Sequence, residues 1–294
     1  MTAAAGTRDE GRGGGRATTA LLLAPASAFF LLLLLLPLAV VIVYSFGERA
    51  PAGGYLPAFS FDNYLNLAAR GQAFLNTLTL APLGTLLCAL VAYPLAYFLA
   101  VRASPRIRTL LLVLVIVPFW ASQLLRIYAW LLILGSKGIP ALLSLVGIED
   151  LLLVNTRFAV LVGMVYGYLP LMIFPIYVSL EKLDKRLLEA SSDLGARPWR
   201  TFLQVTLPMS LEGVATGSLL VFILLMGEFI IPALLGGGKV FFIGNALVDL
   251  FLQSRNWPYG AAVSIALIAI MLASIVTYMR FVLGKRGQRP NAFM

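Results

Sequence analysis

Residues 20–44 read ALLLAPASAFFLLLLLLPLAVVIVY and contain no charged residue. At about 1.5 Å per residue, a helix of this length crosses the roughly 30 Å hydrocarbon core of a bilayer. The apolar core exceeds the roughly 7 to 15 residues of a cleaved signal peptide, and no small-residue cleavage site follows it. This stretch therefore predicts a retained membrane-spanning helix, and it sets the fold class.

The composition of the whole chain agrees with this prediction. Of its 294 residues, 60% are apolar and 12% are charged, against roughly half and a quarter in soluble domains. These proportions exclude a soluble enzyme with a small anchor. The chain has no His and one cysteine, Cys88, which excludes an internal disulfide and a His- or Cys-rich centre for zinc, haem or an iron–sulfur cluster. We predict no metal site, no bound cofactor and no catalytic residue in this chain.

Five further apolar runs are long enough to cross a bilayer. We predict them at residues 75–101, 109–134, 158–180, 213–235 and 261–283. Two shorter stretches, 139–153 and 240–252, are interrupted by polar or acidic residues and are predicted to be surface or re-entrant helices. The predicted fold is an all-α, multi-pass membrane protein with six transmembrane helices, in which residues 20–284 form one membrane domain.

The distribution of cations predicts the orientation, because Lys and Arg near span ends stay in the cytoplasm. With a cytoplasmic N-terminus, fifteen Lys and Arg lie inside and six outside. Both termini are then cytoplasmic, with residues 1–19 a disordered basic arm near anionic membrane lipid and residues 285–294 a cytoplasmic tail. The net charge of +9 is explained by this asymmetry, so no nucleic-acid partner is predicted.

Two charged residues, Arg126 and Glu228, fall inside predicted spans, both in the outer half. Charges at that depth are usually paired or face a cavity. One interpretation is an ion pair or gate formed by the two. The other is that Glu228 faces the transport path and attracts a cationic substrate amine, while Arg126 meets lipid headgroups or a carbonyl.

Aromatic residues near the span ends have two readings. Tyr166 and Tyr168, with Trp120, Tyr128 and Trp130, offer rings for cation–π contact with a polyamine. Tyr and Trp in such positions are more often interface anchors. Trp257 is likewise first an anchor and second a gate element. Prolines inside the predicted spans are expected to kink the helices, at Pro94, Pro118 and Pro170.

The connection 181–210 is long, charged and patterned as two short helices. Asp184 is suited to cap a helix that begins at Lys185, and Gly195 suits a left-handed stop. Pro198 suits the first position of a second helix, which we expect to end ahead of Pro208. An amphipathic hairpin on the membrane surface is the alternative.

The residues of this loop resemble the EAA loop of ATP-binding-cassette importer permeases. The matching positions are Glu189, Ala190, Ser191, Gly195, Val205, Leu207 and Pro208, and the family spacing is kept throughout. Ser191 replaces the Ala of the third motif position, and Val205 replaces Ile. Both replacements are small and should preserve a docking helix.

Across residues 21–282 the chain is similar to one branch of that family, the spermidine/putrescine-type permeases. The resemblance is carried, in order, by PFW at 118–120, RIYAW at 126–130, YGYLP at 166–170, LEKLD at 180–184, GEF at 227–229, LGG at 235–237 and NWP at 256–258. Permeases for ferric iron, thiamine and phosphonates are close relatives of this branch, so the resemblance leaves those substrates open beside polyamines.

The resemblance implies a type I importer permease in a bacterial cytoplasmic (inner) membrane. It implies two permease subunits, two cytoplasmic ATPase subunits, and a periplasmic or lipid-anchored binding protein that delivers the substrate. ATP and Mg²⁺ would be bound by the ATPase, because this chain has no phosphate-binding loop of the Gly-x-x-x-x-Gly-Lys type. The 181–210 loop would sit in a groove of the ATPase and move as a rigid body, tilting the following span.

Two other classes were weighed. An ion-coupled secondary transporter should show paired repeats with interrupted helices and midplane acids, and neither is found. An intramembrane enzyme needs a nucleophile, acid pair or metal-ligand set within its spans, and a lone glutamate does not supply one.

Overall fold

The computed structural model describes residues 12–149 and 151–284, and these are helical over most of their length. In chain order the helices are α1 (Arg12–Ser45), α2 (Asp62–Leu65), α3 (Gly71–Tyr97), α4 (Pro105–Trp120), α5 (Gln123–Leu134), α6 (Ile139–Ser144), α7 (Arg157–Glu181), α8 (Lys185–Asp193), α9 (Pro198–Thr201), α10 (Leu207–Met226), α11 (Ile230–Leu235), α12 (Ile243–Val248) and α13 (Trp257–Gly284). The 3₁₀ turn η1 (Asn66–Arg70) and the π-helical turns η2 (Phe98–Arg102), η3 (Phe202–Thr206) and η4 (Asp249–Gln253) join them. A small hairpin pairs β1 (Glu48–Arg49) antiparallel with β2 (Tyr55–Leu56).

Six helical segments in the described part of the chain are long and apolar enough to cross a membrane. They are Leu21–Ser45, Asp62–Arg102, Gln123–Ser144, Arg157–Glu181, Pro198–Met226 and Trp257–Arg280. The prediction of an all-α protein with six spans is confirmed.

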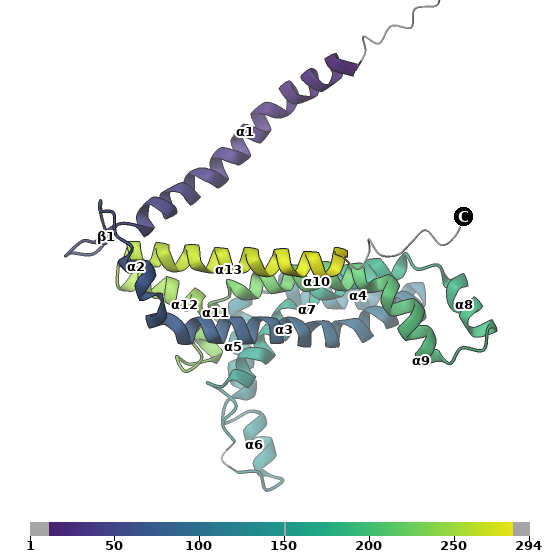
Figure 1. Cartoon of the computed structure of the whole chain (residues 1–294). Helices are drawn as coiled ribbons and strands as arrows, with labels where there is room; N and C mark the ends of the chain where they lie inside the picture. The colour runs from purple at the N-terminus through teal and green to yellow at the C-terminus, as the bar shows by residue number, and fades with distance from the viewer. Residues whose placement is uncertain (1–11, 150, 285–294) are drawn as a thin grey trace, which may run out of the picture.

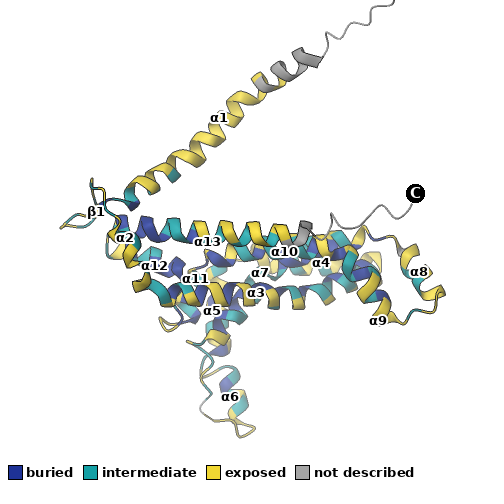
Figure 2. Ribbon diagram, viewed as in Figure 1, coloured by how far each residue is buried: buried dark blue, intermediate teal, exposed yellow. Residues whose placement is uncertain are grey.

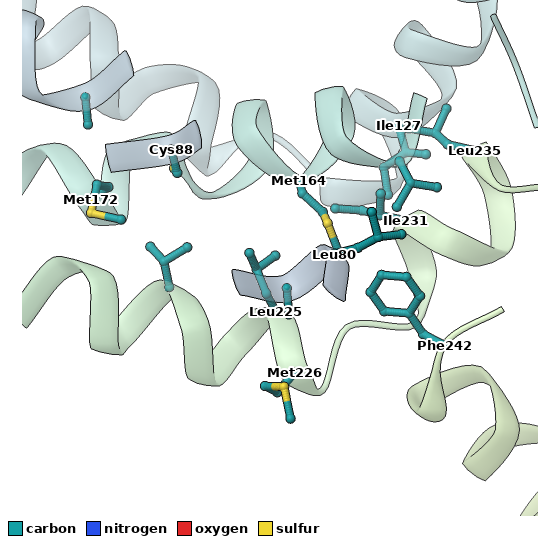
Figure 3. Packing of buried hydrophobic residues seen from close by; sticks show 14 of the residues in the cluster. Leu80, Cys88, Ile127, Met164, Met172, Leu225, Met226, Ile231, Leu235 and Phe242 are labelled. Carbon is teal, nitrogen blue, oxygen red and sulfur yellow. The ribbon is translucent and has the colours of Figure 1, made fainter. Parts of the chain in front are cut away.

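Three helices form the centre of the bundle, because α7 packs against both α3 and α10, and α3 also packs against α10 (Figure 1). Glycines allow the close approach, as is usual where helices meet in membranes. A Cβ on Gly213 of α10 would lie 2.4 Å from the carbonyl oxygen of Pro175 in α7. Beyond this contact the core continues toward α11, where Figure 3 shows Leu80, Ile231 and Phe242 lying close together.

Helix α1 leaves the bundle (Figure 1). The end of α1 packs against α13 and contacts the hairpin and α2 through Tyr44 and Ser45. Residues 21–37 are all exposed, as the long exposed stretch in Figure 2 shows. The helix begins at Arg12, so residues 12–19 are helical, although the sequence placed them in a disordered arm. Helix propagation from a stable span explains this, because adding residues to an existing helix is far easier than starting one. Residues 1–11 of the arm and the tail 285–294 lie outside the described residues.

The third span differs from its prediction. A single helix was expected over 109–134, but α4 ends at Trp120 and α5 begins at Gln123, with Ala121 and Ser122 extended between them. The span that the structure offers here starts at Gln123. Arg126 therefore lies in the first turn of α5, not in the later half of a long helix. The break lies within the uncharged stretch 109–125, so hydropathy gives no signal for it.

The fifth span is displaced toward the N-terminus. It was expected over 213–235, but it runs from Pro198 through Pro208 to Met226. The second short helix of the loop thus does not end ahead of Pro208. A proline ring collides with the carbonyl four residues earlier in a regular helix, and here the preceding turn, η3, is a wider π-helical one. The widened turn allows the helix to continue.

The two short apolar stretches behave differently. The first contains α6, which extends away from the bundle (Figure 1). In the second, α12 is buried at Ile243, Gly244, Asn245 and Ala246. Helix α12 is therefore enclosed by its neighbours and does not lie on the surface.

Candidate functional site

Helices α8 and α9 form an elbow, residues 184–201, beside the end of the bundle. The Asp184 carboxylate accepts a hydrogen bond from the backbone N–H of Arg186 at 3.0 Å, which caps α8 as the sequence predicts. After α8 the chain reverses at Gly195, whose φ of +75° is left-handed. The Gly195 N–H donates to the carbonyl oxygen of Ser192 at 2.9 Å. Pro198 then opens α9 at its first turn.

A side-chain hydrogen bond holds the two arms of the elbow together. Ser191 Oγ in α8 lies 2.9 Å from Thr201 Oγ1 in α9, and Thr201 is buried. The sequence treated Ser191 as a small replacement for the family's alanine. The structure adds a specific function for its hydroxyl, since it joins α8 to the start of the fifth span. Thr201 could not be found from sequence, because no motif position marks it.

The outer surface of the elbow is apolar at three exposed positions: Leu187, Leu194 and Trp199, with Leu194 88% exposed. Glu189 and Ala190 are exposed on the same short helix. Large apolar side chains at a charged loop are typical of a surface that binds another protein. The first four motif positions, Glu189 to Gly195, therefore lie together on the elbow.

The remaining motif residues, Val205, Leu207 and Pro208, are half-buried and lie farther along, in the shaft formed by η3 and α10. Here Phe202 makes edge-to-face contact with Tyr93, at 5.6 Å between ring centroids. Tyr93 also shares a 2.8 Å hydrogen bond with Ser210 of α10. These two contacts fasten the shaft to α3.

Glu228 lies between α10 and α11 and is buried, with 5% of its surface exposed. Its Oε1 accepts hydrogen bonds from the backbone N–H groups of Phe229, Ile230 and Ile231, at 3.0, 2.8 and 3.2 Å. Its Oε2 accepts from the Tyr168 hydroxyl and, at 3.4 Å, from Gln123 Nε2. The carboxylate thus satisfies the free N–H groups at the start of α11 and ties three helices to the break.

The predicted ion pair between Arg126 and Glu228 does not form, although both residues are described. Arg126 lies over the Phe119 ring, at 5.6 Å from guanidinium carbon to centroid, and its Nε is buried without a hydrogen-bond partner. The ion pairs in the described ranges are Arg70–Asp249 and Arg108–Glu181. The pairing was wrong because Glu228 is already occupied by backbone donors at the helix break.

We expect Glu228→Ala to destabilise the protein by several kcal/mol, at about 1–3 kcal/mol for each buried donor left unsatisfied. Glu228→Gln should cost much less, because the amide oxygen can still accept from the same N–H groups. Thermal unfolding in detergent would measure both, with Tyr168→Phe as the control that removes a single bond. If Glu228→Ala unfolds at the same temperature as the unaltered protein but stops uptake, then Glu228 acts in the transport path and does not stabilise the fold.

The aromatic candidates are not gathered at one site. Tyr168 meets Glu228 as described, while Tyr166 packs edge-to-face on Trp130 at 5.6 Å between centroids. Trp257 lies elsewhere, at the start of α13, where its ring stacks near Tyr44 and its Nε1 donates to the Phe251 carbonyl oxygen at 3.2 Å. Of these three aromatic residues, Tyr168 is therefore the one that contacts the buried Glu228.

A cavity of about 770 Å³ opens between α5, α11, α12 and η4. Tyr128, Phe229 and Phe241 supply aromatic rings to its lining, and Asp249 supplies a carboxylate. In the sequence Asp249 is only a polar interruption of the apolar stretch 240–252, because no neighbouring residue indicates that it lines a cavity. Within the described residues no group of three or more His, Cys, Asp or Glu side chains is placed to hold a metal.

Comparison with known proteins adds a family. Residues 92–286 match the model of the family described as binding-protein-dependent transport system inner membrane component. The spermidine/putrescine transport system permease protein PotB of Haemophilus influenzae is 42% identical over 249 residues, covering 83% of this chain and 87% of the relative. PotB of Escherichia coli is 40% identical, covering 83% and 90%.

Among solved structures, one matches at a TM-score of 0.74 with 18% sequence identity, covering 91% of this chain and 95% of the other. It is a subunit in the crystal structure of a bacterial alginate ABC transporter in complex with an alginate pentasaccharide-bound periplasmic protein. At this identity the match shows a shared fold.

Proposed function

Since this chain belongs to the binding-protein-dependent transport system inner membrane components, we propose that it is the permease of an ATP-driven importer for polyamines such as spermidine and putrescine. The family and the six apolar helices make it a multi-pass protein of the inner membrane and a transport subunit. The polyamine assignment is supported by relatives of 40–42% identity over 83% of the chain, which carry spermidine/putrescine in their names. Those relatives favour polyamines over ferric iron, thiamine or phosphonate.

The elbow is the site where we propose that a cytoplasmic ATPase binds. The observation that carries this is the exposed apolar surface of Leu187, Leu194 and Trp199 on a rigid, capped helix pair. The charge asymmetry of the sequence supports a cytoplasmic location for this elbow and for both chain termini. Each of two permease subunits would seat one ATPase, and ATP with Mg²⁺ would be bound there.

Force from the ATPase would reach the bilayer through the shaft. Because α9, η3 and α10 are continuous from Pro198 to Met226, a push on the elbow tilts the fifth span as one body. The contact between Phe202 and Tyr93 carries the tilt to α3. This is a hinge or shear movement of packed helices. The hydrogen bond between Ser191 and Thr201 keeps α8 and α9 in a fixed arrangement during the movement.

A second permease subunit, identical or related, would cover apolar surface that is exposed in this chain. Helix α1 supports this, since its residues 21–37 make no buried contact with the rest of the described chain. At the opposite end from the elbow, the hairpin and the stacked rings of Tyr44 and Tyr55, 4.3 Å apart, form a firm surface. We place the docking of a soluble binding protein there.

Reconstitution tests this function. The chain is assembled in proteoliposomes with its ATPase, its second permease and a binding protein loaded with spermidine, and uptake of labelled spermidine is followed. We expect uptake only with ATP and with the loaded binding protein. Uphill uptake by the permease without any ATPase would contradict the proposal, and so would an assembled transporter that carries an uncharged solute and not spermidine.

A further inference from the structure

The cavity between α5, α11, α12 and η4 has a chemistry suited to a cation. Its volume is about 770 Å³, and among the side chains that line it Asp249 is the sole charged one. No Lys or Arg lines it, while Asn245 and Gln253 add amides. A cavity with one negative charge, aromatic rings and no positive charge favours an organic cation and disfavours an anion.

The rings are available to a ligand. Tyr128 is 53% exposed and Phe229 is 42% exposed, so neither face is used up by packing within the chain. An ammonium group over such a ring is attracted by the negative face of its π system. A flexible polyamine can place one ammonium at the carboxylate and lay its methylenes along the apolar wall.

The wall behind Asp249 is rigid. The Asn245 side chain donates to the Phe229 carbonyl oxygen at 2.6 Å and accepts from the Phe242 N–H at 3.1 Å. From α3, Asn76 Nδ2 donates to the Phe241 carbonyl oxygen at 3.1 Å. These bonds hold α12 between α11 and α3, so the carboxylate that follows α12 has a fixed position.

Asp249 already has a cationic partner. Its Oδ2 accepts from Arg70 Nη2 at 2.8 Å, and the two side chains are 31% and 29% exposed. Arg70 itself does not line the cavity. The pair is partly exposed, so an arriving ammonium can reach this carboxylate and replace the guanidinium.

We propose that Asp249 is a substrate-binding residue, which holds an ammonium group of a cationic substrate in this cavity by displacing Arg70. The proposal rests on the proposed function, because it takes the cargo to be a polyamine. Arg70 serves as the resting counter-ion. Without Arg70, the Asp249 carboxylate in the empty cavity would be unpaired, and the substrate would bind more tightly than it does to the unaltered protein.

The test measures binding of labelled spermidine to the purified permease–ATPase complex without the binding protein. We expect Asp249→Asn to raise the Kd about tenfold or more, as expected for loss of a charged hydrogen bond. Arg70→Gln should lower the Kd about two- to fivefold, because it removes a weak competitor. Asp249→Glu should stay close to the unaltered protein.

A structural function of the ion pair would give a different pattern. In that case Asp249→Asn and Arg70→Gln would weaken binding equally, and exchanging the two charges (R70D with D249R) would restore it. We expect the exchange not to restore binding, because position 249 then carries a positive charge. Glu181→Gln, which breaks the other ion pair at the opposite end of the bundle, is the matched control and should leave the Kd unchanged.

The outcomes separate this inference from the proposed function. If the full transporter takes up spermidine but the unaltered complex does not bind it, or Asp249→Asn binds it as well, the cavity assignment is overturned and polyamine import stands. If the full transporter takes up no spermidine with a loaded binding protein, the proposed function itself fails.

Discussion

Gly195→Pro is expected to abolish ATP-coupled uptake while the permease still folds and inserts. Gly195 has a φ of +75°, and the proline ring fixes φ near −65°. Proline also removes the N–H that donates to Ser192. No atom lies within 4 Å of a Cβ built at this glycine, so the change acts on the backbone of the elbow alone. The elbow would lose its shape, and with it the surface that we propose binds the ATPase.

A graded series separates backbone conformation from other effects. Gly195→Asn should retain most uptake, because asparagine tolerates the left-handed region, whereas Gly195→Ala costs roughly 1–2 kcal/mol there. Uptake and ATPase activity stimulated by the loaded binding protein are measured on the assembled transporter.

Glu189→Lys, a charge reversal on the exposed face of α8, should also uncouple transport without unfolding the chain.

Gly147, which follows α6, supplies a matched control outside the elbow. Its φ is +87°, nothing lies within 4 Å of its would-be Cβ, and its N–H also donates to a carbonyl three residues earlier. Gly147→Pro thus imposes the same local strain outside the elbow and should leave coupling intact. Equal loss of uptake in both proline variants, or normal coupling in Gly195→Pro, would refute a specific function of the elbow.

Gly213→Val is expected to destroy the central packing of the bundle. A Cβ at Gly213 would lie 2.4 Å from the carbonyl oxygen of Pro175, 2.5 Å from the Ser179 Cβ and 3.0 Å from the Ile176 Cα. Two of these atoms belong to the backbone of α7, so no side chain can rotate away. Overpacking costs about 1–3 kcal/mol where neighbours can yield, and here α7 and α10 must separate. Thermal unfolding of the purified complex would show the loss.

Gly167→Ala is the control for this prediction. A Cβ at Gly167, also in α7, meets only the Ile231 Cδ1 at 3.7 Å, an ordinary contact. Alanine should be neutral or slightly stabilising at that helical position. We expect Gly213→Ala to fall between Gly167→Ala and Gly213→Val. A Gly213→Val protein as stable as Gly167→Ala would show that the two helices are not held at this distance.

Local signals explain why the elbow could be predicted. A capping aspartate, a glycine in the left-handed region and a proline at a first helical turn each act through the nearest few residues. The structure places Asp184, Gly195 and Pro198 in these positions. The Ser191–Thr201 bond was not predictable, because it depends on how the two arms fold against each other.

The break at Glu228 was missed despite a signal. Hydropathy alone extended the fifth span through it, yet Gly227 follows the last residue of α10 and the acidic Glu228 lies two residues before the start of α11. Glycine followed by a capping acid is a helix stop and start. That pattern predicts that the Glu228 carboxylate accepts from backbone N–H groups, and it therefore argues against an ion pair between Glu228 and Arg126.

The sequence by itself determined the number of spans, the family and the turns of the elbow, because transfer of apolar side chains from water and the capping of helix ends depend on nearby residues. The tertiary structure alone decided that Asp249 meets Arg70, that Glu228 is a cap, and that α12 closes a cavity. Those contacts join residues far apart in the chain, and their geometry depends on the packing of α3, α7 and α10, which no local pattern specifies.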